Sequence, residues 1–383
     1  MKLLIKNIYK ICLITIGVDK MKIVVFTCST GGGHNACAKY IKEEFNLNGI
    51  ECDIKDYFEL VGDRASNVAE KLYLDSTKGK GSIFGGVYKL GELYSKTNIP
   101  SPVYGLNMLV KEKLKKYLKE NNYTLAIGTH LFPCLALTKL KKEENINFIN
   151  VATDYECIPF WEETNPNEFV IPSILLKDTF LKKGFKEETI LPIGIPISSK
   201  FINTTGCADL PKDKEIILIA SGSMGFGNIK EIVLNLLAQM NNVYVLVVCG
   251  NNEVLKNELK AITNPNLIVY GFVNNMNELI KSSTIVVTKP GGLTTTEVAV
   301  MNKPLIHINP IPGVEDYNAT FFASNFMSIR VNNINNLVGE ITRLMNDKNL
   351  QNLMIENQKK YINKNSAADL VKYIIDKYGS ETL

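Results

Sequence analysis

The sequence lacks the features by which several common classes of protein are recognised. Its formal net charge at pH 7 is only +4 over 383 residues, so we do not expect the strongly basic face of a nucleic-acid-binding protein. None of its eight cysteines forms a Cys-x-x-Cys pair, which argues against a disulfide framework and against a zinc site. We therefore expect reduced, buried thiols, as in a protein of the cytosol.

The sequence also lacks a hydrophobic run long enough to cross a membrane. The apolar stretch 11–18 follows three lysines, as in a signal peptide, but it is far shorter than the roughly 20 residues of a spanning helix. No small-residue cleavage site follows it, and Met21 opens an apolar strand as a natural start would. We interpret residues 1–20 as an N-terminal extension upstream of the true start, with a weak membrane-surface anchor as the alternative.

What the sequence does contain, from Met21 onward, is a regular alternation of short β-branched runs with longer amphipathic stretches. This alternation predicts βα units and parallel sheets that are buried on both faces. The expected strands are Lys22–Cys28, Glu51–Asp56, Thr124–His130, Phe148–Asp154, Phe169–Pro172 and Ile190–Ile195 in a first series, then Glu215–Ala220, Val243–Cys249, Leu267–Tyr270, Thr284–Thr288 and Pro304–Asn309 in a second. Helices are expected over Lys230–Met240, Glu297–Met301 and Asn349–Tyr378.

The two series are separated by the stretch 196–214, in which Pro, Ser, Asn, Thr and Gly replace the apolar runs. We therefore expect an α/β protein with two Rossmann-like, doubly wound domains that face each other across a cleft. The expected boundaries are 21–198 for the first domain, 199–213 for a linker, 214–350 for the second domain and 351–383 for a C-terminal helical tail. In such sheets ligands bind at the carboxyl ends of the strands, so the loops that follow the strands are the places to look for chemistry.

The loop after the first strand is rich in glycine and ends in a histidine. Gly31, Gly32 and Gly33 let the backbone bring a phosphate or an oxyanion close to the free N–H groups of the following helix. The spacing is neither G-x-G-x-x-G nor that of a Walker A loop. His34 is predicted to be a general base, because its pKa suits proton transfer near neutral pH. The alternative is a polar residue at a helix start.

The second domain opens in the same way. Its first strand is followed by Ser221, Gly222, Ser223, Met224 and Gly225, and the glycines and exposed amides of this loop suit a diphosphate. An asparagine stands where a Walker A loop has lysine, so nucleoside triphosphate hydrolysis is not expected. A plain tight turn between strand and helix is the alternative.

Two further loops of the second domain, 288–297 and 309–319, carry many polar groups. Thr294 and Glu297 have the spacing of a capping box, so Glu297 is either a helix cap or a ligand. A carboxylate at this place can accept the two hydroxyls of a ribose, as the acidic residue does in dinucleotide-binding folds. The presence of the second polar loop favours the ribose.

Together these motifs resemble those of the monogalactosyldiacylglycerol synthase and processive diacylglycerol glucosyltransferase family, relatives of the MurG transferase with GT-B architecture. The resemblance covers nearly the whole chain from Met21. It rests on the Gly-Gly-Gly-His turn, Thr129-His130-x-Phe132-Pro133, Thr153-Asp154-Tyr155, Gly194-Ile195-Pro196, Gly271-Phe272-Val273, and Lys289-Pro290-Gly291-Gly292 through Asn318-Ala319. The chain departs from the family at Val314, where many relatives have Gln, and in the loop after Asp154, where relatives often carry His and Trp.

The resemblance implies a role for each of these segments. In the C-terminal domain it places the donor sugar nucleotide, with Ser221 to Gly225, Gly291 and Gly292 at the diphosphate, Phe272 and Val273 at the uracil, Glu297 at the ribose, Leu293 and Thr294 in the same loop, and Glu315, Asp316 and Asn318 by the sugar. In the N-terminal domain it places the lipid acceptor, with Gly32, Gly33, His130, Phe132, Pro133 and Tyr155 around it. His34 is then the base, and Asp154 is the second catalytic candidate.

The implied activity is that of an inverting glycosyltransferase, which moves glucose or galactose from UDP-glucose or UDP-galactose to diacylglycerol and makes a membrane glycolipid. No cofactor is expected besides the UDP-sugar donor substrate, and no metal, because no Asp-x-Asp pair occurs. The expected location is cytoplasmic, peripheral on the inner face of the cell membrane. A sugar-nucleotide epimerase, a MurG-like UDP-GlcNAc transferase and a non-catalytic sugar-nucleotide-binding protein are the alternatives.

The segment 71–119 suggests how such an enzyme reaches its lipid. It contains ten lysines against three acidic residues, interleaved with tyrosines, leucines and other apolar residues. Cationic and aromatic groups together suit an anionic membrane surface, where each lysine contributes roughly 1 kcal/mol. The alternative is that 111–119 is the solvated face of a helix and that the aromatic residues pack inward.

Overall fold

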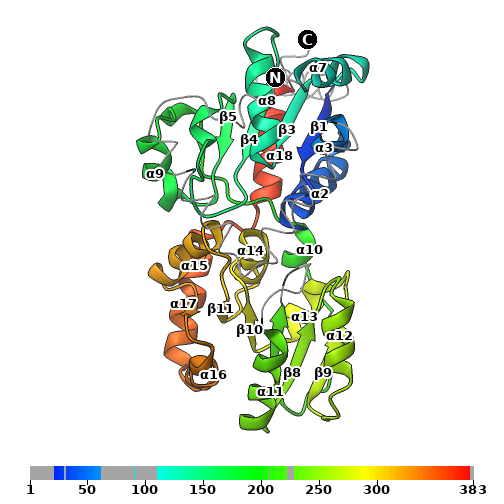
Figure 1. Ribbon diagram of the computed structural model, residues 1–383. Coiled ribbons are helices and arrows are strands. Elements are labelled where there is room, and N and C mark those ends of the chain that lie inside the picture. Colours follow the sequence, from blue (N-terminus) through cyan, green and yellow to red (C-terminus); the bar gives the residue numbers. More distant parts are fainter. Residues whose placement is uncertain are drawn as a thin grey trace, which may run out of the picture.

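The computed structural model describes residues 21–29, 32–61, 91, 110–206, 208–220, 222 and 228–379 (Figure 1). The predictions for residues 1–20, for most of the segment 71–119 and for Ser221, Ser223, Met224 and Gly225 lie outside these ranges.

The first domain is built on a parallel sheet with the strand order β2-β1-β3-β4-β5-β6. Its strands are β1 Lys22–Thr27, β2 Glu51–Asp56, β3 Leu125–Gly128, β4 Phe148–Val151, β5 Glu168–Val170 and β6 Ile190–Leu191. Its helices are α2 Gly32–Leu47, α3 Tyr57–Val61, α7 Lys111–Glu120, α8 Leu131–Lys141 and α9 Lys177–Lys182, with 3-10 turns at Trp161–Glu163, Ile174–Leu176 and Glu187–Thr189. All six predicted strands of the first series are present.

The second domain repeats this plan with the strand order β12-β11-β10-β7-β8-β9, again parallel. Its strands are β7 Glu215–Ala220, β8 Val243–Val248, β9 Leu267–Tyr270, β10 Ile285–Thr288, β11 Leu305–Ile308 and β12 Ile329–Val331. Its helices are α11 Ile229–Gln239, α12 Glu253–Lys260, α13 Met276–Ser282, α14 Gly292–Val300, α15 Val314–Ser324, α16 Leu337–Asn346 and α17 Lys348–Tyr361, with a 3-10 turn at Ile334–Asn336. The edge strand β12 was not predicted, because it is three residues long and carries Arg330 at its centre.

The sheets are buried on both faces, as the apolar runs predict. In β1, Ile23 and Val25 join one core cluster while Val24 and Phe26 join another on the opposite face. The first of these clusters continues into the second domain, so the two domains share a core at their junction. The six described cysteines are free and buried, which confirms the prediction made for them.

The chain crosses between the domains at two adjacent places. The first crossing follows β6 and includes the short helix α10, Ser199–Ile202. The second joins α17 to α18, Ser366–Tyr378, at the end of the chain. Gly194 has φ +102°, and a Cβ atom there would lie 3.3 Å from the Cβ atom of Ser366, so the two crossings pack tightly against each other. The Ser366 hydroxyl donates to the carbonyl oxygen of Ile195 at 2.7 Å.

The C-terminal tail is two helices that belong to different domains, whereas the sequence predicts one continuous helix. In α17 the Gln358 amide donates to the carbonyl oxygens of Lys303 and Met327 in the second domain. In α18 the Tyr378 hydroxyl donates to the fully buried carboxylate of Glu168 in β5 at 2.6 Å, and Lys377 pairs with the same group. Figure 1 shows α18 within the first domain, so the end of the chain fastens the two domains together.

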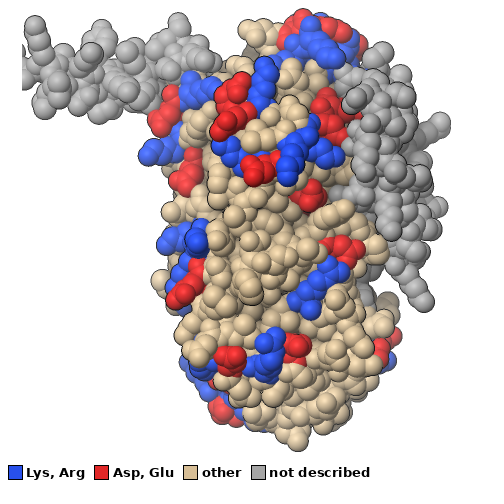
Figure 2. Space-filling view, turned by 90° about the vertical axis from the view of Figure 1, so that its left-hand side faces the viewer, with Lys and Arg blue, Asp and Glu red and all other residues tan. Residues whose placement is uncertain are grey.

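Helix α7 makes up most of the described part of the lysine-rich segment. Leu114 of this helix is buried in the core, and on its outer side Lys111 pairs with Glu143 at 2.6 Å and Lys119 with Glu144 at 3.0 Å. On the face shown in Figure 2, basic and acidic side chains occur side by side rather than in separate patches. For 111–119 the solvated helix face is therefore the better interpretation. Across the described ranges, no helix is both long enough and apolar enough to cross a membrane.

Candidate active site

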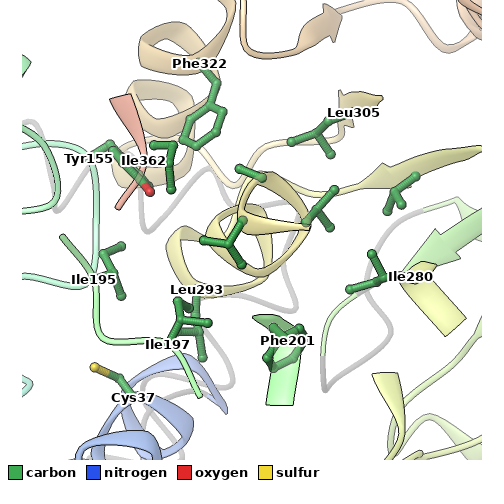
Figure 3. Packing of buried hydrophobic residues seen from close by; sticks show 14 of the residues in the cluster. Cys37, Tyr155, Ile195, Ile197, Phe201, Ile280, Leu293, Leu305, Phe322 and Ile362 are labelled. Atoms are coloured by element: carbon green, nitrogen blue, oxygen red, sulfur yellow. The ribbon is translucent and has the colours of Figure 1, made fainter. Parts of the chain in front are cut away.

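The candidate site lies where the carboxyl ends of the two parallel sheets meet. In the first domain α2 follows β1, and in the second domain α14 follows β10, so the first turns of both helices point toward the junction. A Cβ atom added to Gly33 in α2 would lie 3.7 Å from the Cβ atom of Leu293 in α14. Figure 3 shows Leu293 close to Ile197 of the first crossing, with Cys37 of α2 nearby.

His34 is held at this junction by contacts to a single ring nitrogen. Its Nδ1 atom lies 2.8 Å from the carbonyl oxygen of Thr129 and 3.0 Å from the hydroxyl of Thr153. A carbonyl oxygen only accepts, so Nδ1 carries the proton and donates it to Thr129. Among the described residues the Nε2 atom has no hydrogen-bond partner, and its lone pair is therefore available to take a proton.

The charge state of His34 suits a base. Burial lowers the pKa of His34, and the nearby Asp154 carboxylate partly opposes this by favouring the charged ring. The imidazole is consequently neutral at pH 7, while the imidazolium formed after proton uptake faces a negative partner. The prediction of a general base thus has a physical basis in the structure, although it stays a prediction until activity is measured.

A row of rings extends from His34 through the residues predicted to contact the acceptor. The His34 and His130 rings meet edge to face with centroids 4.7 Å apart, and Phe132 follows at 4.8 Å from His130. His130 also caps α8, because its Nδ1 atom accepts from the Phe132 N–H group at 3.2 Å. Gly32 is exposed and Gly33 half-buried at the start of α2. Pro133 is buried within α8, so it supports the row without reaching a ligand.

Tyr155 does not lie where the acceptor prediction requires it. This residue follows β4 in the first domain, but only 1% of its surface is exposed. Its ring stacks on Phe321 with centroids 4.9 Å apart, and its hydroxyl lies 2.7 Å from that of Thr296, both in the second domain. Figure 3 shows Tyr155 and Phe322 on the same side of α14. Tyr155 is therefore an anchor between the domains, and its assignment to the acceptor is wrong for this arrangement.

Asn318, predicted to lie by the sugar, forms a second bridge beside this anchor. Its amide donates to Asp154 Oδ1 and to the carbonyl oxygen of Pro290, each at 2.9 Å. Its carbonyl oxygen accepts from the N–H group of Tyr155 at 2.6 Å. Asn318 is fully buried, so as placed it joins the two domains and orients the Asp154 carboxylate.

The start of α14 is buried against the first domain, and its free N–H groups are the feature that suits an anion. Gly291 is the N-cap and has no side chain to cap the helix, and no described residue accepts a hydrogen bond from the N–H groups of Gly292, Leu293 or Thr294. These groups and the helix dipole favour a negatively charged ligand. Gly292 also contacts the first domain, since a Cβ atom there would lie 1.9 Å from the carbonyl oxygen of Thr153. The predicted diphosphate position is thus next to the residues that hold His34.

Lys289 adds a positive charge to this place. Its side chain passes over Gly222, where an added Cβ atom would lie 2.8 Å from Lys289 Cε, and Gly222 has φ +74°. Its Nζ atom pairs with Glu315 Oε1 at 2.6 Å, and Glu315 Oε2 accepts from the Ile311 N–H group at 2.9 Å. Glu315, predicted to lie by the sugar, is the partner that orients Lys289. The sequence showed Lys289 within the motif but gave it no role.

Glu297 is buried in the middle of α14 and is not a helix cap. The N-cap of this helix is Gly291, which rules out the capping alternative. Only 6% of Glu297 is exposed, and its Oε1 atom accepts a hydrogen bond of 2.7 Å from the hydroxyl of Tyr40 in α2. Burial raises the pKa of Glu297 to about 7, and the Tyr40 hydrogen bond acts in the opposite direction. The motif did not reveal Tyr40, which lies 257 residues away.

The remaining predicted donor residues occupy the rim of the second domain. Phe272 follows the edge strand β9 and is 63% exposed, as a ring that stacks on a base must be, and Val273 is half-buried beside it. Two strand spacings separate β9 from β7, which is roughly 10 Å and leaves room for a ribose between base and diphosphate. Asp316 instead pairs with Arg330 at 2.7 Å and accepts from the Gly313 N–H group, so it stabilises the start of α15.

Comparison with known proteins assigns both halves of the chain. The model of the monogalactosyldiacylglycerol (MGDG) synthase family matches residues 34–197, and that of the glycosyltransferase family 28 C-terminal domain matches residues 216–374. A processive diacylglycerol beta-glucosyltransferase of Bacillus cereus (strain G9842) is 30% identical over 344 residues, which cover 86% of this chain and 87% of that protein. The protein of the same description from Bacillus cytotoxicus is 29% identical over 382 residues, covering 95% and 96%.

Solved structures with the same fold are more distant in sequence. MurG of Acinetobacter baumannii superimposes with a TM-score of 0.59 at 16% identity, covering 93% of this chain and 99% of that one. The calicheamicin glycosyltransferase CalG4 gives a TM-score of 0.63 at 11% identity, covering 94% and 98%. The predicted GT-B architecture is confirmed.

Proposed function

The chain belongs to the family of monogalactosyldiacylglycerol synthases and processive diacylglycerol beta-glucosyltransferases, and from this membership we propose that it glucosylates diacylglycerol. It is a glycosyltransferase that moves a hexose from a UDP-sugar to diacylglycerol. The observation that carries the proposal is His34: its Nε2 atom has no partner among the described residues, and its Nδ1 atom contacts Thr153, which packs on the first turn of α14. Glucose is the proposed sugar because the relatives at about 30% identity are described as glucosyltransferases.

The proposed reaction is a single displacement. The acceptor hydroxyl of diacylglycerol attacks C1 of the donor sugar while its proton passes to His34 Nε2. The bond from C1 to the β-phosphate oxygen breaks, and its electron pair leaves with UDP, so the anomeric centre is inverted. Atoms and charge balance without an oxidant or reductant, so the step needs no redox co-reactant besides the donor substrate. Asp154 stabilises the imidazolium formed in this step.

The leaving diphosphate is stabilised by groups of this chain. Two kinds of group follow β10: the Lys289 ammonium and the first-turn N–H groups of α14. The Lys289 side chain lies over Gly222. Groups that are fixed before the reaction stabilise the developing charge without reorganising during it. Glu297 accepts the ribose hydroxyls, and Phe272 stacks on the uracil.

The enzyme works from the cytoplasmic side, bound peripherally to the inner face of the membrane. Support comes from the composition of 71–119. The proposal rests on the lysines before α7, because Lys111, Lys115 and Lys119 of α7 pair with Glu143 or Glu144. These lysines attract anionic lipid, and the aromatic residues between them enter the interface.

The test is to incubate the purified protein with diacylglycerol vesicles and either UDP-glucose or UDP-galactose, each labelled in the sugar, and to separate the lipids. Labelled glycolipid is expected with UDP-glucose, and with UDP-galactose only at a much lower rate. Faster transfer from UDP-galactose would correct the sugar, and the absence of labelled lipid with both donors would overturn the proposed acceptor.

A further inference from the structure

Helices α2 and α14 face each other across the junction, and matching positions line the two faces. In α2, Gly33, Cys37 and Tyr40 lie on one side, because their spacing of four and three residues matches the helical repeat. In α14, Leu293 and Glu297 are four residues apart and lie opposite them. Gly33 meets Leu293. Tyr40, two turns after Gly33 in α2, meets Glu297, which lies one turn after Leu293 in α14. Both contacts join the two domains.

The Tyr40 side chain is held by a ring contact and by a hydrogen bond. Its ring packs edge to face on Phe201 of α10, with centroids 6.0 Å apart, and the hydroxyl donates to Glu297 Oε1 at 2.7 Å. A hydrogen bond from a phenol to a carboxylate is a charge-assisted bond, which is stronger and more directional than one between neutral groups. The bond uses one carboxylate oxygen and leaves Oε2 without a partner among the described residues.

We propose that Tyr40, although it belongs to the acceptor domain, is a positioning residue for donor recognition: its hydroxyl holds the Glu297 carboxylate in place for the donor ribose when the domains close. This inference rests on the proposed assignment of Glu297 to the ribose. Because the two residues come from different domains, donor affinity then depends on closure of the cleft. The acceptor domain thus contributes to binding a substrate that it does not itself contact.

The protonation of Glu297 gives the inference a second consequence. Burial raises the pKa of Glu297 to about 7, and the Tyr40 hydrogen bond favours the ionised form, so loss of that bond raises the pKa further. The other charged group beside Tyr40 is Glu43, which accepts from the Ser198 hydroxyl at 2.8 Å and pairs with Lys200 of α10 at 3.2 Å. The remaining neighbour is the buried Cys37 thiol, whose pKa burial raises.

The test is Tyr40→Phe, which removes only the hydroxyl, with UDP affinity measured by calorimetry between about pH 6 and pH 8. In the unmodified protein, UDP affinity is expected to rise with pH around 7, as Glu297 ionises. In the variant, affinity at pH 7 is expected to fall roughly tenfold and the rise to move upward by roughly one pH unit, the scale of one charge-assisted hydrogen bond. Tyr123→Phe is the matched control, since that hydroxyl donates to Asp53 within the first domain at 2.8 Å. It should change neither quantity.

The outcomes separate this inference from the assignment on which it rests. Glu297→Gln should weaken UDP binding and remove its pH dependence, and in the double variant Tyr40→Phe should then have no further effect. If Glu297→Gln leaves UDP binding unchanged, the ribose assignment itself is wrong. If Glu297→Gln weakens binding but Tyr40→Phe does not, only the positioning role fails. Tighter binding by Tyr40→Phe would also overturn it, because Tyr40 would then compete with the ribose.

Discussion

Gly292 is the residue through which the closed arrangement can be tested most simply. It begins α14, and a Cβ atom there would lie 1.9 Å from the carbonyl oxygen of Thr153 and 3.2 Å from Asp154 Oδ1. The nearest contact is backbone and not the end of a flexible side chain, so Gly292→Ala cannot be accommodated by a rotamer change. The two domains have to separate there by more than about 1 Å to restore an ordinary van der Waals distance.

This separation falls on the elements that hold the reacting groups. Thr153 contacts His34, and α14 carries the predicted diphosphate site, so the base and the donor move apart. A misplacement of about 1 Å can lower a rate by roughly 100-fold. We therefore expect kcat of Gly292→Ala to fall by about that factor. The melting temperature should fall as well, because the clash loosens the core that the two domains share. Sugar transfer to diacylglycerol vesicles and calorimetric unfolding measure the two quantities.

The control is the same substitution at Gly339, which lies within α16 with no atom within 4 Å of an added Cβ. Gly339→Ala should retain full activity and stabilise the protein by roughly 0.5–1 kcal/mol, because alanine favours a helix. Near-normal kcat in Gly292→Ala would refute the reasoning, since catalysis would then occur with α14 and Thr153 apart.

Three further predictions concern pH, the domain anchor and the membrane. As the pH falls from about 8 to 6, KM for the UDP-sugar should rise, because Glu297 with its pKa of about 7 loses its charge. The kcat should stay constant, because burial lowers the pKa of His34 and keeps the ring neutral. A constant KM over this range would contradict the ribose role. Tyr155→Ala should weaken domain association by roughly 3–5 kcal/mol, the scale for a deleted buried ring, so that calorimetry shows two unfolding transitions instead of one; a single unchanged transition would refute the anchor. Replacing Lys78, Lys80, Lys89 and Lys96 by Glu should abolish sedimentation with phosphatidylglycerol vesicles at low salt and leave UDP binding intact, whereas persistent vesicle binding would sink the electrostatic docking hypothesis.

The fold was predictable because most of its strands each correspond to a short apolar run in the sequence. Runs such as Glu215–Ala220 are apolar, short and followed by glycine-rich loops, and the observed bounds of β7 agree with the predicted ones. The predictions failed where the local sequence pattern does not determine the structure. Strand β12 has Arg330 at its centre, so it does not form an apolar run. The break between α17 and α18 depends on which domain each helix packs against. The apolar periodicity of the sequence indicates neither the strand nor the break.

The candidate site was predictable only to the level of its loops. Glycines and a histidine after a strand point to a ligand edge, and His34 does lie at the junction. The motif Thr153-Asp154-Tyr155 does not say that the tyrosine ring enters the other domain, because that depends on how the domains close. Tyr40 carries no motif at all, since one tyrosine on an amphipathic helix resembles any other. Contacts between residues so far apart in sequence need the structure.

The most direct test of the account is the activity of His34→Ala with labelled UDP-glucose and diacylglycerol vesicles, measured beside its affinity for UDP. Loss of a general base should lower kcat by about 100-fold or more. The affinity for UDP should stay at the unmodified value, because His34 bonds to Thr129 and Thr153 and to none of the groups assigned to the donor. Transfer at a near-normal rate in this variant would contradict the account and make Asp154 the next candidate for the base.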